Sequence, residues 1–216
     1  MNVLQARDIP DAWYQAVRHV LENGEDYIVE RGSFEGHSRR QVPFFAMVVN
    51  HPEARPLGVT YRDNVISTDD AIFNYYLQLI SPEIAPNETY TYGERIALRL
   101  PEVAEMLCKT PNTNQATIEV GKPEDILLDD PPCLRLVSWK KVRDTLQLTV
   151  FFRSWDVVNG LPFNLGGLQY LNETIATLAN IKPGKLVAYS DGLHAYDMSF
   201  GILGDQFKEC HLAGGQ

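Results

Sequence analysis

Hydrophobic residues in this chain recur either at helical spacing or in short apolar runs. A helix is predicted between Asp8, which can cap it, and Gly24, which ends it. Apolar residues at helical spacing follow Thr68, a second capping residue, and predict a helix over residues 69–80. A third apolar face begins after Asn164 and runs to about residue 179. These three segments are the predicted packing helices.

Shorter apolar or alternating stretches predict strands between and after these helices. Strands are expected over residues 26–30, 43–49, 116–120 and 185–190. A strand hairpin is expected after Pro131 and Pro132, with its turn at residues 140–144. Gly166 and Gly167 each cost the third helix about 1 kcal/mol relative to alanine, which indicates close approach of a ligand or another helix.

The composition is that of an ordinary globular protein. Its 216 residues, 44% of them hydrophobic and 22% charged, suit one domain over residues 1–216 with a substantial core. The formal net charge of −9 argues against a general binder of nucleic-acid polymers, which needs a surplus of Lys and Arg on one face. No apolar run approaches the length that spans a bilayer, and the first residues lack a signal peptide's apolar segment. We therefore expect a cytoplasmic protein without a membrane partner.

The three cysteines differ in their surroundings. Cys108, Cys133 and Cys210 are an odd number without a Cys-x-x-Cys pair, so neither a disulfide framework nor a metal site is indicated. Two prolines fix the backbone before Cys133 and a strand follows it, so its thiol is a candidate nucleophile on a stiff corner. The thiolate is the nucleophilic form, and a nearby guanidinium lowers a thiol pKa. We therefore expect Arg153, at the end of the returning strand, to activate Cys133.

Several motifs follow one another in a recognisable order. Pro131-Pro132-Cys133 precedes Arg153-Ser154-Trp155-Asp156, which precedes Gly160-Leu161-Pro162-Phe163-Asn164. Tyr90-Thr91-Tyr92-Gly93-Glu94-Arg95 lies upstream of them, and Asp191-Gly192-Leu193-His194-Ala195-Tyr196 lies downstream. In the order and the residues of these motifs, the stretch from about residue 85 to 196 resembles the thymidylate synthase family, and it is closest to the short archaeal-type members.

The resemblance implies a fold and a set of partners. The fold is α+β, with a mixed β-sheet flanked by helices, and the family forms a homodimer through the back of that sheet. A pyrimidine nucleoside monophosphate is the implied substrate, and 5,10-methylenetetrahydrofolate is the implied cosubstrate. The implied reaction transfers a one-carbon unit to C5 of the pyrimidine.

This chemistry explains why these residue types occur together. Addition of the Cys133 thiolate at C6 would convert the ring to an enolate whose C5 can attack a methylene carbon. Arg153 would lower the thiol pKa and bind the phosphate together with Ser154. An amide can donate to O4 and accept from N3–H, so Asn164 favours a uracil ring, whereas an aspartate there would favour cytosine.

The resemblance implies four further roles around the ring, the sugar and the folate. Tyr92 would join the proton-transfer network over the pyrimidine; the alternative is a half-buried structural tyrosine. His194 and Tyr196 resemble the pair that bonds the sugar hydroxyl. Asp156 resembles a catalytic carboxylate that holds the pterin, and the alternative is simple support of the fold.

The phosphate site is where the sequence departs most from the family. Arg31 is the best match to an arginine that grips the phosphate from an early Gly/Ser-containing loop, and Arg40 is second; the alternative is a solvated basic loop. Asn114 and Gln115 stand where most members carry two arginines that reach the partner's phosphate site. Each lost charge-assisted contact is worth about 1.5–3 kcal/mol, so phosphate affinity is expected to fall unless other groups compensate.

Other departures concern the catalytic machinery. The helix over residues 69–80 carries Asn74 and Gln78 where a catalytic glutamate is expected. Trp155 is bulkier than the usual residue, and Leu134 replaces a common histidine. The C-terminal sequence 214–216 is polar, whereas the family ends in an apolar residue that closes over the folate.

Three hypotheses follow from these motifs and departures. The first is a thymidylate synthase that methylates deoxyuridylate. The second is a C5 hydroxymethylase acting on dUMP, UMP, dCMP or CMP, in which water quenches the exocyclic methylene. The third is a nucleotide-binding homologue without catalysis, against which the retained Cys133 and Arg153 argue.

Overall fold

The computed structural model describes residues 3–86 and 88–203. Their helices are α1 Ile9–Asn23, α2 Asp69–Leu79, α3 Tyr92–Ile96, α4 Leu100–Lys109, α5 Leu161–Leu178 and α6 Phe200–Leu203. Short 3-10 helices are η1 Ala97–Arg99, η2 Pro123–Leu127 and η3 Asp197–Ser199. The strands are β1 Leu4–Ala6, β2 Glu25–Ile28, β3 Ser38–Val42, β4 Phe45–Val49, β5 Val59–Tyr61, β6 Asn64–Ser67, β7 Thr117–Glu119, β8 Leu134–Val142, β9 Thr145–Phe152, β10 Trp155–Asp156, β11 Lys182–Ser190 and β12 Leu193–Tyr196. The predicted α+β class is confirmed.

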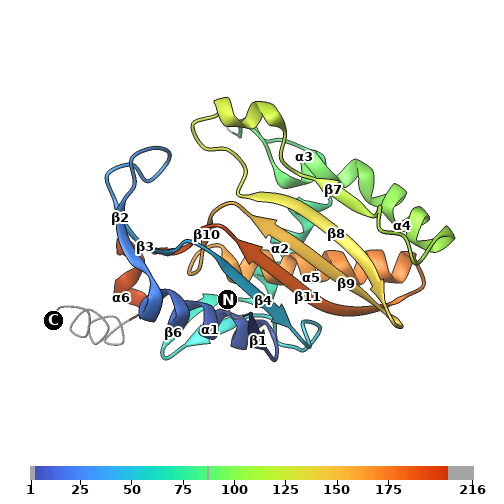
Figure 1. Cartoon of the computed structure of the whole chain (residues 1–216), viewed down its shortest axis with the longest axis horizontal. Helices are drawn as coiled ribbons and strands as arrows, with labels where there is room; N and C mark the ends of the chain where they lie inside the picture. The colour runs from blue at the N-terminus through green and yellow to red at the C-terminus, as the bar shows by residue number, and fades with distance from the viewer. Residues whose placement is uncertain (1–2, 87, 204–216) are drawn as a thin grey trace.

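The larger of the sheets is mixed and contains the predicted hairpin. Among the described residues it has six strands in the order β1-β4-β11-β9-β8-β7, with β11 parallel to β9 and antiparallel to β4. The β8–β9 hairpin pairs Leu134 with Phe152. The beginning of β8 and the ends of β9 and β11 therefore lie together at one end of the sheet, which is the upper left in Figure 1.

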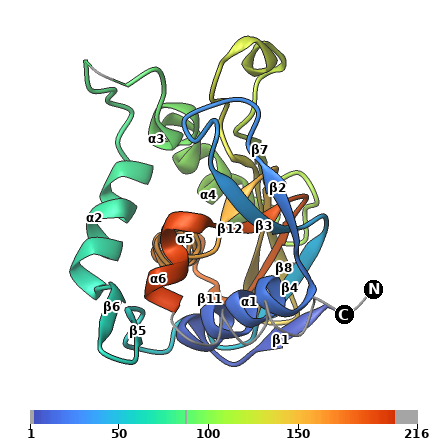
Figure 2. The ribbon, with the colours of Figure 1, turned by 90° about the vertical axis from the view of Figure 1, so that its left-hand side faces the viewer.

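Helices α5 and α2 form two layers on one face of this sheet. Figure 2 shows α5 between the strands and α2. Residues on nearly every side of α5 are accordingly buried. A Cβ added at Gly166 would lie 2.4 Å from Cγ2 of Ile72, and one at Gly167 would lie 2.4 Å from Cδ1 of Tyr75. The predicted close approach at these glycines is confirmed, and the approaching element is another helix.

A second sheet joins the site end of the first. Its strand order is β10-β12-β3-β2, with β10 parallel to β12. The register places Arg39 of β3 opposite both Tyr196 of β12 and Tyr27 of β2. Because successive strand residues point to opposite faces, Arg39 and Arg40 lie on opposite faces of this sheet.

The predicted helix starts are confirmed by their caps. Asp8 accepts a hydrogen bond from the Asp11 amide at 2.9 Å, and Thr68 accepts one from the Ala71 amide at 3.2 Å. Helix α4 begins at Leu100, with Pro101 in its first turn. None of the helices in the described ranges is long and apolar enough to cross a membrane.

Several predicted boundaries were wrong, including those of β2 and β4, which were predicted at 26–30 and 43–49. The hairpin turn is shorter than 140–144, because residues 140–142 pair with β9. Strand β11 begins at Lys182 rather than residue 185, since Lys182 and Pro183 already pair with β9. Asn164 lies inside the first turn of α5, which begins at Leu161. Cys210 and the predicted polar tail at 214–216 fall outside the described residues.

Candidate active site

Cys133 and Arg153 face each other across the end of the hairpin. The Arg153 amide donates to the Cys133 carbonyl at 2.9 Å, which continues the pairing of β8 with β9. The Arg153 guanidinium donates from Nε to the Pro132 carbonyl at 3.2 Å and from Nη2 to the Pro131 carbonyl. Nη2 also lies 3.6 Å from Oδ1 of Asp130. The arginine thus holds the two-proline turn that carries the nucleophile, as the hairpin pattern predicts.

The electrostatics of the thiol differ from the expectation. Burial raises the pKa of Cys133 above its ordinary value, and this effect outweighs the opposing effect of the Arg153 charge. Asp130 adds to the increase. The expected lowering of the thiol pKa by the Arg153 charge is present, but burial outweighs it in the free protein. The thiol is mostly protonated at neutral pH, so proton removal must accompany its attack.

Tyr92 supports the residue that follows the nucleophile. Its hydroxyl accepts a hydrogen bond from the Leu134 amide at 3.2 Å. Burial raises the pKa of Tyr92 well above its ordinary value, and the nearby Tyr75 and Cys133 raise it further. The hydroxyl therefore stays protonated beside Cys133. The structure brings Tyr92 to the site, and its role in proton transfer remains a prediction.

The Asn164 amide is held from both ends. Nε1 of Trp155 donates to Oδ1 of Asn164 at 2.9 Å, and Nδ2 of Asn164 donates to the Tyr75 hydroxyl at 2.7 Å. The Trp155 ring is buried and stacks on Phe152, with 4.2 Å between ring centroids and 5° between planes. Tyr75 comes from α2, the helix on which a catalytic glutamate was expected.

His194 and Tyr196 lie side by side on the second sheet. Their rings meet edge to face at a centroid distance of 4.7 Å. Nδ1 of His194 lies 2.9 Å from the Gly192 carbonyl, which can only accept, so Nδ1 carries the hydrogen. Nε2 is then an acceptor, and it is buried without a hydrogen-bond partner among the described residues. Burial lowers the pKa of His194, which keeps this nitrogen unprotonated and suited to accept from a ligand hydroxyl.

Three arginines line an open cleft of about 820 Å³ next to the hairpin end. They are Arg31, Arg39 and Arg153. Arg31 is exposed and donates to the Leu128 carbonyl at 2.9 Å, across the cleft from its own loop. Arg39 has a buried Nε without a hydrogen-bond partner among the described residues, and its charge acts on both His194 and Tyr196.

Arg40 does not lie in this cleft. Its Nε and Nη2 donate to the two carboxylate oxygens of Asp26, each at 2.9 Å, and Nη1 lies 3.5 Å from the Leu21 carbonyl of α1. A buried guanidinium that forms a bidentate ion pair anchors the sheet to α1. The second-choice assignment of Arg40 to the phosphate was therefore wrong, and the adjacent Arg39 lines the cleft in its place.

Asp156 supports the turn that leads into α5. Oδ1 accepts from the Val158 and Asn159 amides at 2.8 and 3.1 Å, and Oδ2 accepts from the Asn159 side chain at 3.0 Å. The register pairs Asp156 with His194, which brings the carboxylate to the site. Pterin binding by Asp156 remains a prediction, as does phosphate binding by the half-buried Ser154.

Sequence comparisons agree with this arrangement. A family model described as thymidylate synthase matches residues 74–211. The chain belongs to the thymidylate synthase family. A protein of Methanococcoides burtonii named "Putative thymidylate synthase" is 30% identical over 91% of this chain and 90% of its own length. Proteins of the same name from Methanosarcina acetivorans and Methanopyrus kandleri are 29% and 27% identical, over 94% and 90% of this chain and 93% of each relative.

The positions that depart from the usual pattern of this family differ in how near they lie to the thiol. Leu134 follows Cys133 directly and Trp155 bonds Asn164, whereas Asn74 and Gln78 are exposed on α2. Asn114 and Gln115 are exposed in the turn before β7. In this chain α2 therefore carries amide side chains at both positions where a catalytic glutamate was expected.

Two site residues were missed by sequence reasoning. Tyr75 was interpreted as one of several apolar residues on α2, because its spacing is that of a packing face. Arg39 was passed over for its neighbour Arg40. The signal for Arg39 was the alternation of β3, which puts only one of two adjacent arginines on the face that carries His194 and Tyr196.

Proposed function

We propose that this protein methylates C5 of deoxyuridylate with 5,10-methylenetetrahydrofolate. The observation that carries the proposal is the convergence of Cys133, Arg153, Asn164 and Tyr92 at one end of the mixed sheet, beside a cleft lined by arginines. Family membership supports one-carbon transfer in general, and the amide at position 164 supports a uracil ring.

In the proposed reaction, Cys133 adds to C6 after its thiol loses a proton. The electron pair of the C5–C6 double bond moves toward O4, where the Asn164 amide stabilises the charge. C5 then bonds to the one-carbon unit of the folate, and the bonds of this carbon to the folate nitrogens break. The folate would also supply the hydride that reduces this unit to a methyl group, which leaves dihydrofolate. Loss of the C5 proton and departure of the Cys133 sulfur restore the ring. Tyr92, protonated and adjacent, is placed to take part in these proton transfers.

The nucleotide's other groups have candidate partners. Nε2 of His194 would accept a hydrogen bond from a sugar hydroxyl, which would satisfy a nitrogen that is otherwise buried without a partner. Arg31, Arg39 and Arg153 with Ser154 would bind the phosphate. Arg39 thereby compensates in cis for the charge absent at Asn114 and Gln115. Asp156 would bind the pterin.

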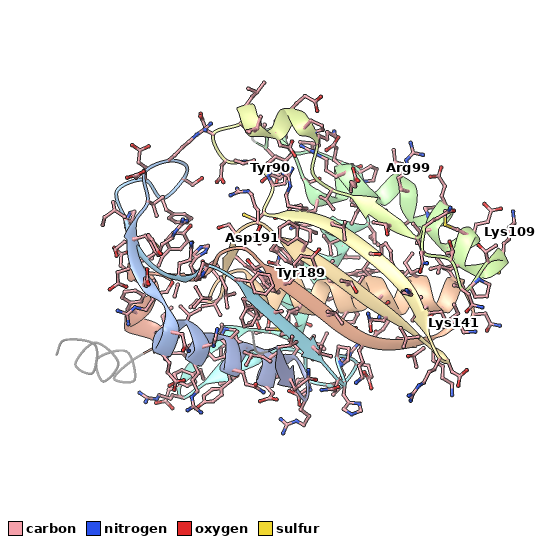
Figure 3. All side chains as sticks on the ribbon, in the orientation of Figure 1. Tyr90, Arg99, Lys109, Lys141, Tyr189 and Asp191 are labelled. Carbon is pink, nitrogen blue, oxygen red and sulfur yellow. The ribbon has the colours of Figure 1, made fainter. Side chains whose placement is uncertain are left out.

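We also infer a homodimer through the face of the six-stranded sheet opposite α5, which none of the described helices covers. Figure 1 shows this face toward the viewer, with α5 behind the strands. It carries Phe151 and Tyr189, whose rings stack at 4.8 Å, and Figure 3 shows Tyr189 toward the end of the sheet where Asp191 lies. Half-exposed aromatic rings on a sheet face are typical of an interface core. Light scattering of the purified protein should give twice the 24.4 kDa chain mass.

The reaction is tested by mass spectrometry of purified protein incubated with methylenetetrahydrofolate and each of dUMP, UMP, dCMP and CMP. A methyl group added to dUMP is the expected result. The Cys133→Ala variant should keep the wild-type melting temperature and lose turnover completely. Intact folate and nucleotide with folded wild-type protein would overturn the proposal.

A second candidate is C5 hydroxymethylation of the same nucleotides. The absence of a glutamate from α2 favours it, because the step after one-carbon transfer then proceeds in altered surroundings. A hydroxymethyl product with any of the four nucleotides would establish this activity in place of methylation.

A further inference from the structure

We propose that Trp155 and Tyr75 make this site selective for uracil over cytosine, with Trp155 fixing the direction of the Asn164 amide and Tyr75 donating a second hydrogen bond to O4. The inference rests on the proposed function, because it assumes that a pyrimidine nucleotide lies against Asn164. It assigns roles to Trp155, which is bulkier than the usual residue of the family, and to Tyr75, which belongs to none of the motifs quoted above.

Trp155 is a rigid donor. An indole nitrogen donates a hydrogen bond and cannot accept one. The ring cannot turn away, because it is buried and stacks on Phe152 at 4.2 Å. Its backbone is also held, since the Trp155 amide donates to the Gly192 carbonyl at 2.9 Å. The atom of Asn164 that faces Nε1 at 2.9 Å must therefore be the oxygen.

A rotated amide would lose this bond. Turning the Asn164 side chain by half a turn would place its NH₂ group against the Trp155 N–H, so that two donors would meet without an acceptor. A buried donor without a partner is costly. The amide nitrogen is thus directed to Tyr75, where it donates at 2.7 Å.

Tyr75 presents a hydrogen to the same place. Its hydroxyl oxygen accepts from Asn164, so its own hydrogen is available for another acceptor. Burial raises the pKa of Tyr75 far above its ordinary value, which keeps that hydrogen in place at any physiological pH. The ring is positioned by its close packing on Gly167, where an added Cβ would lie 2.4 Å from Cδ1.

The groups left over form a pattern that matches one base. Asn164 retains one N–H and one lone pair, and Tyr75 retains one O–H. Uracil offers O4, which accepts two hydrogen bonds, next to N3–H, which donates one. Cytosine offers an amino group, which donates, and an unprotonated N3, which accepts. The amino group would face the two donors, N3 would face the lone pair of Asn164, and neither contact could be a hydrogen bond. As negative charge moves to O4 during thiolate addition, both donors bind more strongly, so Tyr75 is a catalytic residue as well as a selective one.

The test for Trp155 measures base preference in the full chain. Dissociation constants for dUMP and dCMP are measured by calorimetry, which needs no turnover. Wild type is expected to bind dUMP more tightly, and Trp155→Phe is expected to reduce the dUMP/dCMP preference by about tenfold. A wild type that prefers dCMP, or a variant with an unchanged ratio, would overturn the inference. A variant that was only less stable would bind both nucleotides more weakly and would keep the ratio of their dissociation constants.

The test for Tyr75 measures turnover. Tyr75→Phe removes one hydrogen-bonding group and is expected to lower kcat for dUMP by about 100-fold with a smaller change in KM. Tyr76→Phe is the matched control, because Tyr76 follows Tyr75 on α2 but its hydroxyl bonds Thr174 of α5 at 2.9 Å. Equal kcat values for Tyr75→Phe and wild type would overturn the role of Tyr75.

The inference and the proposed reaction can fail separately. A wild type that binds dUMP selectively without turning it over, and loses that selectivity in Trp155→Phe, would refute the reaction and support the amide arrangement. A wild type that binds neither nucleotide refutes both. An enzyme that acts on dCMP as fast as on dUMP refutes the selectivity alone.

Discussion

Asp125 supports a buried ion-pair cluster in the segment that leads into the nucleophile. Arg95 reaches its carboxylate at 2.9 and 3.3 Å and Arg135 at 3.2 Å, while the Lys122 amide donates at 2.8 Å. The side chains of Arg95 and Asp125 are only 6% and 4% exposed. Removing one partner of a buried pair leaves an uncompensated charge and costs about 3–5 kcal/mol. Because this segment lies at the surface, we expect the lower figure of about 3 kcal/mol for Asp125→Asn.

Differential scanning calorimetry measures this effect. A loss of about 3 kcal/mol lowers the melting temperature of a chain of this size by about 6–12 °C. Glu124→Gln is the control, since it makes the same charge change at an exposed neighbouring position and should leave the melting temperature unchanged. If Asp125→Asn lowers the melting temperature by less than about 2 °C, the ion pair does not contribute to stability as a buried pair does, and the reasoning is refuted.

The effect should also depend on pH in a defined direction. Burial alone would raise the pKa of Asp125, but the hydrogen bonds from Arg95 and the Lys122 amide hold it below its ordinary value. The contribution of Asp125 to stability is then fully present above the unfolded pKa of about 3.9, and it is lost as pH falls through the lower folded value. The difference between wild type and Asp125→Asn should accordingly shrink below about pH 4.

Three further predictions concern the site. Arg39→Gln is expected to weaken nucleotide binding by about 10- to 100-fold in calorimetry with little change in melting temperature, and unaltered affinity would exclude it from the phosphate site. Alkylation of Cys133 by iodoacetamide, followed by peptide mass spectrometry, should still rise above about pH 8.5; a plateau by pH 7 would contradict the raised pKa. Gly167→Ala should lower the melting temperature despite a gain in helix propensity of about 1 kcal/mol, because the new Cβ would lie 2.4 Å from the Tyr75 ring; a higher melting temperature would show that the helices can separate.

Local patterns predicted the elements that depend on local physics. The Asp8 and Thr68 caps and the hairpin after the two prolines follow from neighbouring residues, and the structure confirms them. The start of β11 was misplaced because Pro183 and Gly184 are typical of a turn. Pairing with β9 overrides that preference from Lys182 onward.

Only the site residues that belong to a family motif could be predicted from the sequence. Motif order identified Cys133, Arg153 and Asn164, and the hairpin register explains why the first two meet. The pKa of Cys133 could not be predicted from the sequence, because it depends on how much burial opposes the Arg153 charge. Tyr75 could not be found either, since its contact with Asn164 joins residues 89 positions apart.

The alternation of β3 has a consequence for genetic experiments. Arg40 and Val42 are buried, whereas Arg39 and Gln41 lie on the face shared with Tyr196 and His194. A library of all single substitutions across β3 should separate the two kinds of loss by position. Substitutions at 40 and 42 should lower the amount of protein in the cell, and those at 39 should spare the amount and impair growth that depends on activity. Alternate positions of one short strand would thus report separately on folding and on activity.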